Sequence, residues 1–215
     1  MQKISVILCA GGVGSRMQSP IPKQYMVIKG KCIARHSFDV FAEMPEVSEI
    51  VVVCAPEYQQ LFSLPDSSKK ITFAQPGDRR QDSVYNGLKA CALSSSLICV
   101  HDGARPYINP DLVRRVINAA EEYGAASAGM LVRYSVKCVN SDGGVEYSLD
   151  RSRIWEVQTP QIIKRELLEK GFDYAIKHHF TATDDVSLIE QLGLPVQMVE
   201  GSYSNIKITT PEDIV

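Results

Sequence analysis

A glycine-rich segment followed by two cations is the first part of the chain that could do chemistry. The apolar run Ile4–Cys9 leads directly into Ala10-Gly11-Gly12-Val13-Gly14-Ser15-Arg16-Met17. Glycines placed just after a buried strand let the backbone turn tightly and direct its N–H groups at an anion. Arg16 and, further on, Lys23 supply the fixed positive charge that a triphosphate and a departing pyrophosphate need. The sequence therefore predicts a phosphate site at the end of the first strand.

The glycine pattern disfavours two common classes of nucleotide-binding protein. Met17 stands where the motif G-x-G-x-x-G requires its third glycine, and the chain has no G-x-x-x-x-G-K-[ST]. Dinucleotide-dependent dehydrogenases and P-loop NTPases therefore become weaker interpretations. Solvated surface charge is the plain alternative for Arg16 and Lys23, but three glycines at a strand end favour a site.

A second group of polar residues follows another apolar run, Leu97–Val100. Asp102 is expected at the carboxyl end of the sheet, where its carboxylate could contact a substrate hydroxyl or a magnesium shell. A turn-forming role is the alternative, because Gly103 follows. Arg105 would lie beside the same pocket, although the pair could also be a local ion pair worth ~0–1 kcal/mol. His101 is interpreted as a packed residue.

Lys207 and Thr159 each have a functional and a structural interpretation. Lys207 lies in the β-branched run 206–209, where a buried lysine would be costly unless it faced an anion. Thr159 precedes Pro160 and could donate its hydroxyl to a substrate, but the pair also marks an ordinary turn.

Two acidic motifs are typical of helix starts. Asp82-Ser83 is predicted to cap a helix over Val84–Leu93. Asp184 and Asp185 are predicted mainly to open another helix, where negative charge interacts favourably with the helix dipole.

The elements that must position these residues follow an α/β pattern. Continuous β-branched runs, typical of strands covered on both faces, occur at Ile4–Cys9, Ile50–Cys54, Ile71–Ala74, Leu97–Val100 and Ala125–Val132. Amphipathic stretches predict helices over Ile33–Met44, Leu112–Tyr123 and Lys164–His178. Short strands are expected at Val196–Glu200 and Ile206–Ile208. We therefore predict a doubly wound, mostly parallel, Rossmann-like sheet with its function at the carboxyl ends of the strands.

The segment 132–151 departs from this pattern and predicts a β-hairpin inserted in a single domain over residues 1–215. Two apolar stretches flank Ser141-Asp142-Gly143-Gly144, a turn sequence. A two-stranded ribbon is marginally stable alone, so we expect this β-arm to pack on another subunit. Folding over its own sheet is the alternative. At the C-terminus, Pro211–Val215 resembles the start of a helix that is cut short.

Composition limits the partners and the compartment. The chain has 23 Lys and Arg against 25 Asp and Glu, giving a formal charge of -2. Such a balance argues against a polybasic face for nucleic acid or an anionic membrane. Its apolar runs are far shorter than the roughly 20 residues of a membrane helix. Six scattered cysteines without a C-x-x-C pair predict free thiols in the cytoplasm.

Seven motifs, taken together and in order, resemble the 2-C-methyl-D-erythritol 4-phosphate cytidylyltransferases. They span nearly the whole chain, and their order makes the resemblance highly specific. The motifs are Ala10–Met17 with Pro22-Lys23-Gln24, Gly77–Val84, His101–Pro106, Asp150-Arg151, Gln158–Gln161, Thr183–Asp185 and Asn205–Thr209.

The resemblance implies transfer of a cytidylyl group from CTP to 2-C-methyl-D-erythritol 4-phosphate, giving 4-diphosphocytidyl-2-C-methyl-D-erythritol and pyrophosphate. It implies Mg²⁺ bound with CTP, and a homodimer formed through the β-arm, across which Arg151 reaches. The implied catalytic residues are Arg16, Lys23, Arg151 and Lys207. The implied CTP-binding residues are Ala10, Gly11, Gly12, Gly14, Ser15, Gly77, Asp78, Ser83 and Asp102. The implied acceptor-binding residues are Asp102, Arg105, Ser135, Arg151, Thr159 and Lys207.

One departure from the family pattern leaves an alternative open. Tyr134-Ser135 stands where the family usually has Asp-Thr, so the hydroxyl is kept and the acid is not. A ribitol 5-phosphate cytidylyltransferase is therefore the first alternative. A non-catalytic, nucleotide-sensing relative is the second, and the retention of all four catalytic cations argues against it. We expect Arg16, Lys23, Arg105, Arg151 and Lys207 to share one cationic pocket.

Overall fold

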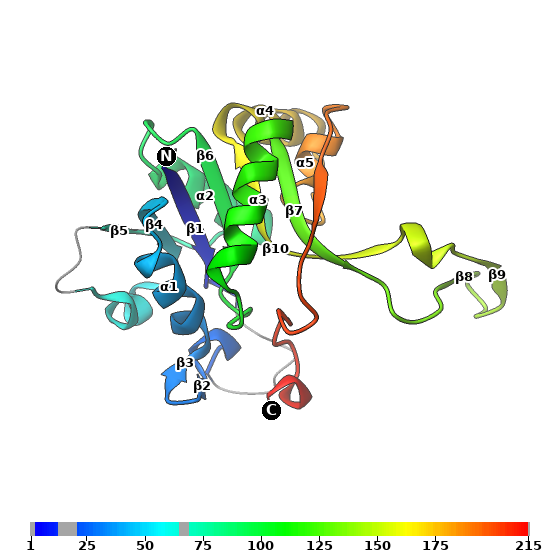
Figure 1. Ribbon diagram of the computed structural model, residues 1–215, viewed down its shortest axis with the longest axis horizontal. Helices are drawn as coiled ribbons and strands as arrows, with labels where there is room; N and C mark the ends of the chain where they lie inside the picture. Colours follow the sequence, from blue (N-terminus) through cyan, green and yellow to red (C-terminus); the bar gives the residue numbers. More distant parts are fainter. Residues whose placement is uncertain (1–2, 13–20, 65–68, 215) are drawn as a thin grey trace.

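A seven-stranded sheet forms the centre of the molecule (Figure 1). The structure, a computed structural model, describes residues 3–12, 21–64 and 69–214. The order across the sheet is β11-β7-β10-β6-β1-β4-β5. The bounds are β1 Ile4–Cys9, β4 Val47–Val53, β5 Lys70–Ala74, β6 Leu97–Asp102, β7 Ala125–Leu131, β10 Trp155–Lys164 and β11 Gln197–Glu200. Within this sheet β10 runs antiparallel to both its neighbours, and the other pairings are parallel.

Helices cover both faces of the sheet because alternate strand residues point to opposite sides. Val6 and Leu8 of β1 belong to one core with residues of α1 and α3, whereas Ile7 belongs to a second core with residues of α2, α4 and α5. The helices are α1 Ile33–Glu43, α2 Arg80–Ala90, α3 Pro110–Tyr123, α4 Arg165–His178 and α5 Ser187–Glu190. The predicted doubly wound, mostly parallel α/β fold is therefore confirmed.

Short elements complete the chain. A two-stranded ribbon, β2 Val27–Ile28 and β3 Lys31–Cys32, precedes α1. The 3-10 helices are η2 Lys23–Tyr25, η3 Pro56–Phe62, η4 Arg151–Arg153 and η5 Pro211–Asp213. Within the described part of the chain, no helix combines the length and the apolar character needed to cross a membrane.

The start of α2 differs from the prediction. The helix begins at Arg80 rather than at Val84, so the proposed cap at Asp82-Ser83 is wrong. Asp82 lies inside the first turn, where its carboxylate accepts a hydrogen bond from the backbone N–H of Arg79 at 3.1 Å. Ser83 follows within the helix and is buried.

The C-terminal third contains three further differences. The strand β10 was not predicted, because its Thr159–Pro160 pair suggested a turn; the ladder to β7 shifts register between Val157 and Gln161, which accommodates the proline. The predicted strand Ile206–Ile208 is an extended segment outside the sheet, held by a hydrogen bond from the Ile208 N–H to the Ala104 carbonyl at 2.9 Å. The predicted terminal helix is the single 3-10 turn η5.

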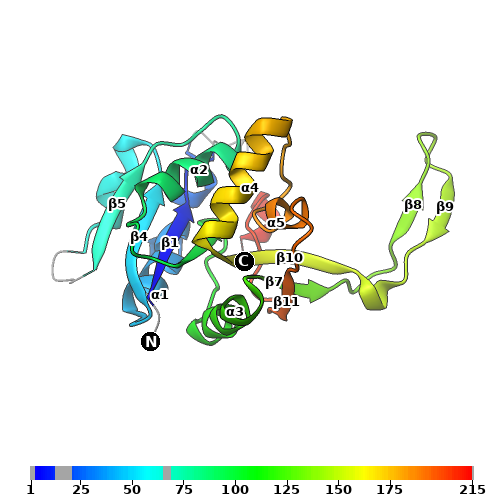
Figure 2. The same cartoon turned by 90° about the horizontal axis from the view of Figure 1, so that it is seen from above.

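The predicted hairpin is present as β8 Lys137–Val139 and β9 Val145–Ser148. The two strands pair only with each other among the described strands, and every residue of β9 is exposed. The hairpin stands on the ends of β7 and β10 and extends far from the body of the molecule (Figure 2). The alternative that it folds over its own sheet is therefore wrong.

Candidate active site

A cavity of about 360 Å³ opens where the strands β1 and β6 end. Residues from five separate segments line it, and eight of them are residues that the sequence singled out. These are Gly11, Gly12, Lys23, Gly77, Asp78, Ser83, Asp102 and Lys207. We refer to this space as the first cavity. Its position at the carboxyl ends of the parallel strands is where an open α/β sheet binds ligands.

Two glycines allow the backbones around the first cavity to approach closely. A Cβ atom on Gly11 would lie 2.6 Å from the ring of Pro76, and one on Gly77 would lie 2.4 Å from the Cβ of Asp82. The N–H of Gly77 also donates to the Oγ of Ser83 at 3.0 Å. Larger side chains at Gly11 or Gly77 would separate these loops.

Gln24 fixes the glycine loop from behind. Its side-chain amide donates to the carbonyls of Ala10 and Gly12, both at 2.7 Å, and its side chain is buried. The hydroxyl of Tyr25 donates to the same Ala10 carbonyl at 2.5 Å. These bonds hold η2, and with it Lys23, against the loop. The sequence contained Gln24 inside a family motif but gave no reason to assign it this contact.

Asp102 lies at the centre of a charged cluster. Its Oδ2 contacts the Nζ of Lys207 at 2.7 Å, and its Oδ1 accepts from the Nε of Arg80 at 2.9 Å. The Nε of Arg105 is farther away, at 3.9 Å. Burial would raise the pKa of Asp102, but the charges of Arg80, Lys207 and Arg105 outweigh it and hold this pKa well below its usual range. Asp102 is therefore ionised.

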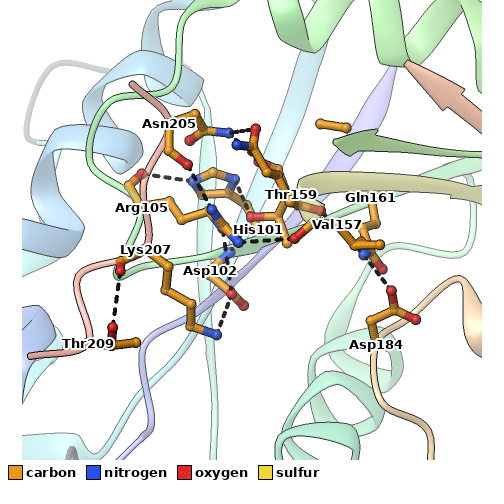
Figure 3. Close-up of polar contacts among 12 residues, drawn as sticks. His101, Asp102, Arg105, Val157, Thr159, Gln161, Asp184, Asn205, Lys207 and Thr209 are labelled. Carbon is orange, nitrogen blue, oxygen red and sulfur yellow. Dashed lines mark hydrogen bonds and ion pairs between the residues drawn. The ribbon is translucent and has the colours of Figure 1, made fainter. Parts of the chain in front are cut away.

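A second cavity of about 300 Å³ adjoins the first, and Figure 3 shows several of the side chains around it, among them Arg105, Thr159 and Lys207. Arg80, Asp102 and Lys207 line both cavities. Among the described residues, the second cavity but not the first is also lined by Arg105 and Thr159, and by the loop residues Thr183 and Asp184. The ammonium of Lys207 thus stands at the boundary between two spaces, each large enough for a small ligand.

Arg105 connects three segments around the second cavity. Its guanidinium donates to the carbonyls of Asn205 at 2.7 Å and Val157 at 3.3 Å. The Asn205 amide in turn donates to the carbonyl of Thr159 at 2.8 Å. Much of the donor capacity of Arg105 therefore holds the segment before Lys207 in place.

The hydroxyl of Thr159 is engaged by buried neighbours. It accepts from the N–H of Asp102 at 3.1 Å and lies 3.0 Å from the Nδ1 of His101. The other ring nitrogen of His101, Nε2, lies 3.1 Å from the carbonyl of Arg105, which can only accept. Nε2 therefore carries the proton, and the Thr159 hydroxyl donates to Nδ1. Thr159 retains only acceptor capacity for a ligand in the second cavity.

His101 is a packed residue, as predicted. It is fully buried, and burial lowers its pKa to about 4. The imidazole is thus neutral at pH 7, and both its nitrogens are occupied.

Comparison with known proteins shows the family of the chain. The family model described as 2-C-methyl-D-erythritol 4-phosphate cytidylyltransferase matches residues 4–215. The chain belongs to this family. A chloroplastic enzyme of that name from Oryza sativa subsp. japonica is 44% identical over 100% of this chain and 73% of the relative. A namesake from Syntrophus aciditrophicus is 41% identical over 99% of this chain and 93% of its own length. The crystal structure of 4-diphosphocytidyl-2C-methyl-D-erythritol synthase from Anaerococcus prevotii superposes with a TM-score of 0.87 at 29% identity, covering 99% of this chain and 95% of that one.

Two predicted residues of this cytidylyltransferase lie far from both cavities. Arg151 and Ser135 are exposed on the arm, and the Nη1 of Arg151 donates to the carbonyl of Arg133 at 3.2 Å. The arm extends away from the body of the molecule (Figure 2), and neither residue lines a cavity of its own chain. The expectation that five cations share one pocket is therefore wrong for a single chain, because Arg151 lies elsewhere. Lys23 and Lys207 share the first cavity, and Arg105 and Lys207 share the second.

Three residues of the predicted phosphate loop, Gly14, Ser15 and Arg16, lie outside the described residues. The described part of the loop, Ala10, Gly11 and Gly12, follows β1 as predicted. Gly11 and Gly12 line the first cavity, whereas Ala10 is buried and does not line it.

Sequence reasoning missed Arg80, which lines both cavities, and the contact that Asp185 makes with it from next to the site. Arg80 contacts Asp102 and also Asp185, at 3.0 Å and 2.8 Å through its two terminal nitrogens. Burial opposes the charge of Arg80, but the two carboxylates outweigh it and raise the pKa of Arg80 well above its usual value. Asp184 behaves as predicted, accepting from the N–H of Ser187 at 2.9 Å. Asp185 does not serve as a helix start, because its carboxylate points inward and binds Arg80.

Proposed function

We propose that the two cavities hold the two substrates of the family reaction, CTP in the first and 2-C-methyl-D-erythritol 4-phosphate in the second. A phosphate oxygen of the acceptor attacks the α-phosphorus of CTP in line. The new P–O bond forms as the bond to the bridging oxygen of the β-phosphate breaks, and pyrophosphate leaves. The observation that carries this proposal is that Lys207 lines both cavities, which supports a position for its ammonium next to both reacting phosphates.

The triphosphate lies against the glycine loop. Gly11 and Gly12 offer backbone N–H groups and Lys23 offers an ammonium at one end of the first cavity. Gly14, Ser15 and Arg16 belong to the same assignment. Gly77, Asp78 and Ser83 line the cavity on the side of α2 and contact the base and ribose.

The acceptor lies in the second cavity. Lys207 and Arg105 face its phosphate and its hydroxyl-bearing carbon chain. The carboxylate of Asp102 and the hydroxyl oxygen of Thr159 accept hydrogen bonds from the substrate hydroxyl groups. A phosphate monoester dianion is already a nucleophile, so the reaction requires positioning and charge stabilisation rather than a general base. The reaction therefore requires no catalytic role for His101, whose role is in packing.

Magnesium enters with CTP, held mainly by phosphate oxygens. The two carboxylate oxygens of Asp102 already contact Lys207 and Arg80. Among the described residues, no three His, Cys, Asp or Glu side chains form a group that could hold a metal ion. The donor set therefore fits an ion carried by the nucleotide, whose chemistry is to neutralise triphosphate charge.

The second copy of a homodimer supplies Arg151 and Ser135 through its arm. Support comes from large apolar side chains that the arm leaves in solvent: Tyr134 is 80% exposed, Val145 62% and Tyr147 55%. A planar guanidinium suits the acceptor phosphate, which it can bind through two parallel hydrogen bonds. All six cysteines are free thiols, which supports a reducing compartment, proposed here as the cytoplasm.

The family match favours the methylerythritol substrate over ribitol 5-phosphate. The departure at Tyr134-Ser135 lies on the exposed arm, so in the proposed homodimer it would bear on the acceptor site of the other copy and not on the second cavity of its own chain. The retained cations and the family match together argue against a non-catalytic relative.

Pyrophosphate release tests the proposal directly. The enzyme is incubated with Mg²⁺ and each of CTP, UTP, ATP and GTP, paired with 2-C-methyl-D-erythritol 4-phosphate or with ribitol 5-phosphate. We expect release mainly from CTP with the methylerythritol substrate. Faster release with ribitol 5-phosphate, or with a purine nucleotide, would contradict the assignment.

A further inference from the structure

Asp185 is a buried carboxylate next to the site that has no role in the proposed reaction. It is 2% exposed, and both its oxygens bind the two terminal nitrogens of Arg80 in a fork-to-fork arrangement. Its backbone is also fixed, because the side-chain oxygen of Gln161 accepts from the N–H groups of Asp185 at 2.8 Å and Val186 at 3.0 Å. Gln161 belongs to β10, so Asp185 is held by the sheet itself.

A continuous chain of ionic contacts leads from Asp185 to the boundary between the cavities. The third directed donor of Arg80, Nε, binds Oδ1 of Asp102 at 2.9 Å. The other oxygen of Asp102 binds Lys207 at 2.7 Å. Each member therefore has its orientation set by the one before it. The four residues come from the loop before α5, the first turn of α2, the end of β6 and the C-terminal segment.

Stability alone is a weak explanation for this arrangement. Buried ion pairs often contribute nothing net, because the cost of removing both charges from water offsets their attraction. The alternating negative and positive side chains from Asp185 to Lys207 do fit a positioning role. Without the Asp185 carboxylate, Arg80 would lose the two hydrogen bonds of its terminal nitrogens. Of the described carboxylates in ion pairs with Arg80 and Lys207, Asp102 alone would then remain.

We propose that Asp185 is a positioning residue that fixes the ammonium of Lys207 between the two substrates, acting through Arg80 and Asp102. This inference rests on the proposed function, in which Lys207 faces both phosphates. Asp185 itself touches neither cavity. Its effect is on the geometry of transition-state stabilisation rather than on nucleotide binding.

The test compares Asp185→Asn with Asp185→Glu in the pyrophosphate-release assay. Asn keeps the shape but loses the charge, and we expect kcat to fall about 10- to 100-fold while KM for CTP changes less than about threefold. Glu keeps the charge and is expected to recover most of kcat. Glu49→Gln is the matched control. Glu49 is likewise buried, but it binds Ser5 and the Ala92 N–H near the opposite end of the sheet, so kcat should stay within about twofold of wild type.

A double-mutant cycle separates positioning from a merely structural role. If Asp185 acts through Lys207, adding Asp185→Asn to Lys207→Ala lowers kcat by less than about threefold more. Multiplicative losses, or a kcat of Asp185→Asn within twofold of wild type, would overturn the proposal. If the Asp185 variants do not fold, Arg80→Lys takes their place, because a lysine ammonium cannot bind both carboxylates as the guanidinium does. Multiplicative losses with Lys207→Ala, or a kcat within twofold of wild type, would again overturn the proposal. Wild-type turnover is measured first, so failure of the proposed function is seen separately.

Discussion

Lys207 and Lys23 are the cations whose placement bears most directly on the proposed transfer. Lys207 lines both cavities, and Lys23 lines the first, where the triphosphate is proposed to bind. Removing a fixed charge from developing negative charge typically costs about 10²- to 10³-fold in rate. We therefore expect Lys23→Ala and Lys207→Ala each to lower kcat/KM by about 10²- to 10³-fold.

The fold of both lysine variants should be intact, because neither side chain belongs to the apolar cores. Circular dichroism and a thermal melt establish this. Lys89→Ala serves as the control, since Lys89 is an exposed lysine on α2 whose ammonium stacks over Tyr85. Near-normal turnover of either site variant would remove the basis of the assignment.

His101 gives the molecule a defined sensitivity to acid. Its folded-state pKa is about 4, below the value of about 6.5 expected in the unfolded chain. Between these values the unfolded chain binds the extra proton, so stability falls as the pH drops from about 6.5 to about 4. The shift corresponds to about 3 kcal/mol, fully lost below the folded-state pKa.

His101→Gln should remove this component, because glutamine has no charge to gain and offers both a donor and an acceptor. Urea unfolding of wild type and variant is measured at pH 7 and at pH 4.5. We expect the wild type to lose more stability between these pH values than the variant does. Equal losses in the two proteins would contradict the burial of a neutral imidazole at this position.

At the scale of elements, the arm is the part whose proposed function depends on a second chain. Its exposed apolar residues and Arg151 stand away from their own cavities. In a symmetric dimer each arm meets the partner's site. We therefore expect Arg151→Ala and Lys207→Ala, inactive alone, to restore activity when mixed, because one site of the mixed dimer then has an intact body and an intact arm.

Random exchange of subunits at equal concentration predicts about a quarter of wild-type activity, since half the dimers are mixed and each has one intact site of two. The subunits are exchanged by mild dilution and reconcentration, and pyrophosphate release is followed over time. Mixing Arg151→Ala with an Arg151→Ala, Lys207→Ala double variant is the control and should restore nothing. Failure of the first mixture despite proven exchange would place Arg151 within its own site.

The sequence predicted those elements that depend on local pattern and missed those that depend on distant partners. Buried strands such as Ile4–Cys9 are continuous apolar runs, and α3 has its cap at Asn109, whose side chain accepts from Leu112 at 2.9 Å. β10 was missed because its Thr159–Pro160 pair suggested a turn, and because its antiparallel pairing with β6 and β7 is not encoded in its own residues. Arg80 was missed for the same reason, since its partner Asp185 is 105 residues away.

At the scale of the whole molecule, the near-neutral charge of the chain conceals a segregated distribution. Within the described part of the chain, the two cavities are lined by five positive side chains, Lys23, Arg79, Arg80, Arg105 and Lys207, and by the carboxylates Asp78, Asp102 and Asp184. A formal charge of -2 therefore excludes only large polyanionic partners. It is compatible with a pocket that binds small phosphorylated ligands.

This distribution makes a prediction about thermal stability with bound nucleotide. A ligand at about 100 times its Kd stabilises the folded state by about 2.7 kcal/mol. For a chain of this size such a gain raises Tm by about 5–10 °C. We expect Mg²⁺ with CTP to produce a shift of this size at about 100 times the Kd of CTP, and CMP, which lacks the β- and γ-phosphates, to produce a smaller one at the same concentration. Chelating the magnesium with EDTA should reduce the CTP shift, because the triphosphate then enters with more uncompensated charge.

The Lys23→Ala variant tests whether the difference between the CTP and CMP shifts in Tm arises at the glycine loop. If Lys23 binds the triphosphate, the variant should lose most of the CTP shift in excess of that of CMP and keep the CMP shift. Lys89→Ala should keep both, as a lysine outside the cavities. Equal shifts by CTP and CMP in the wild type would mean that the β- and γ-phosphates contribute no binding energy, and the first cavity would then hold a monophosphate rather than a triphosphate.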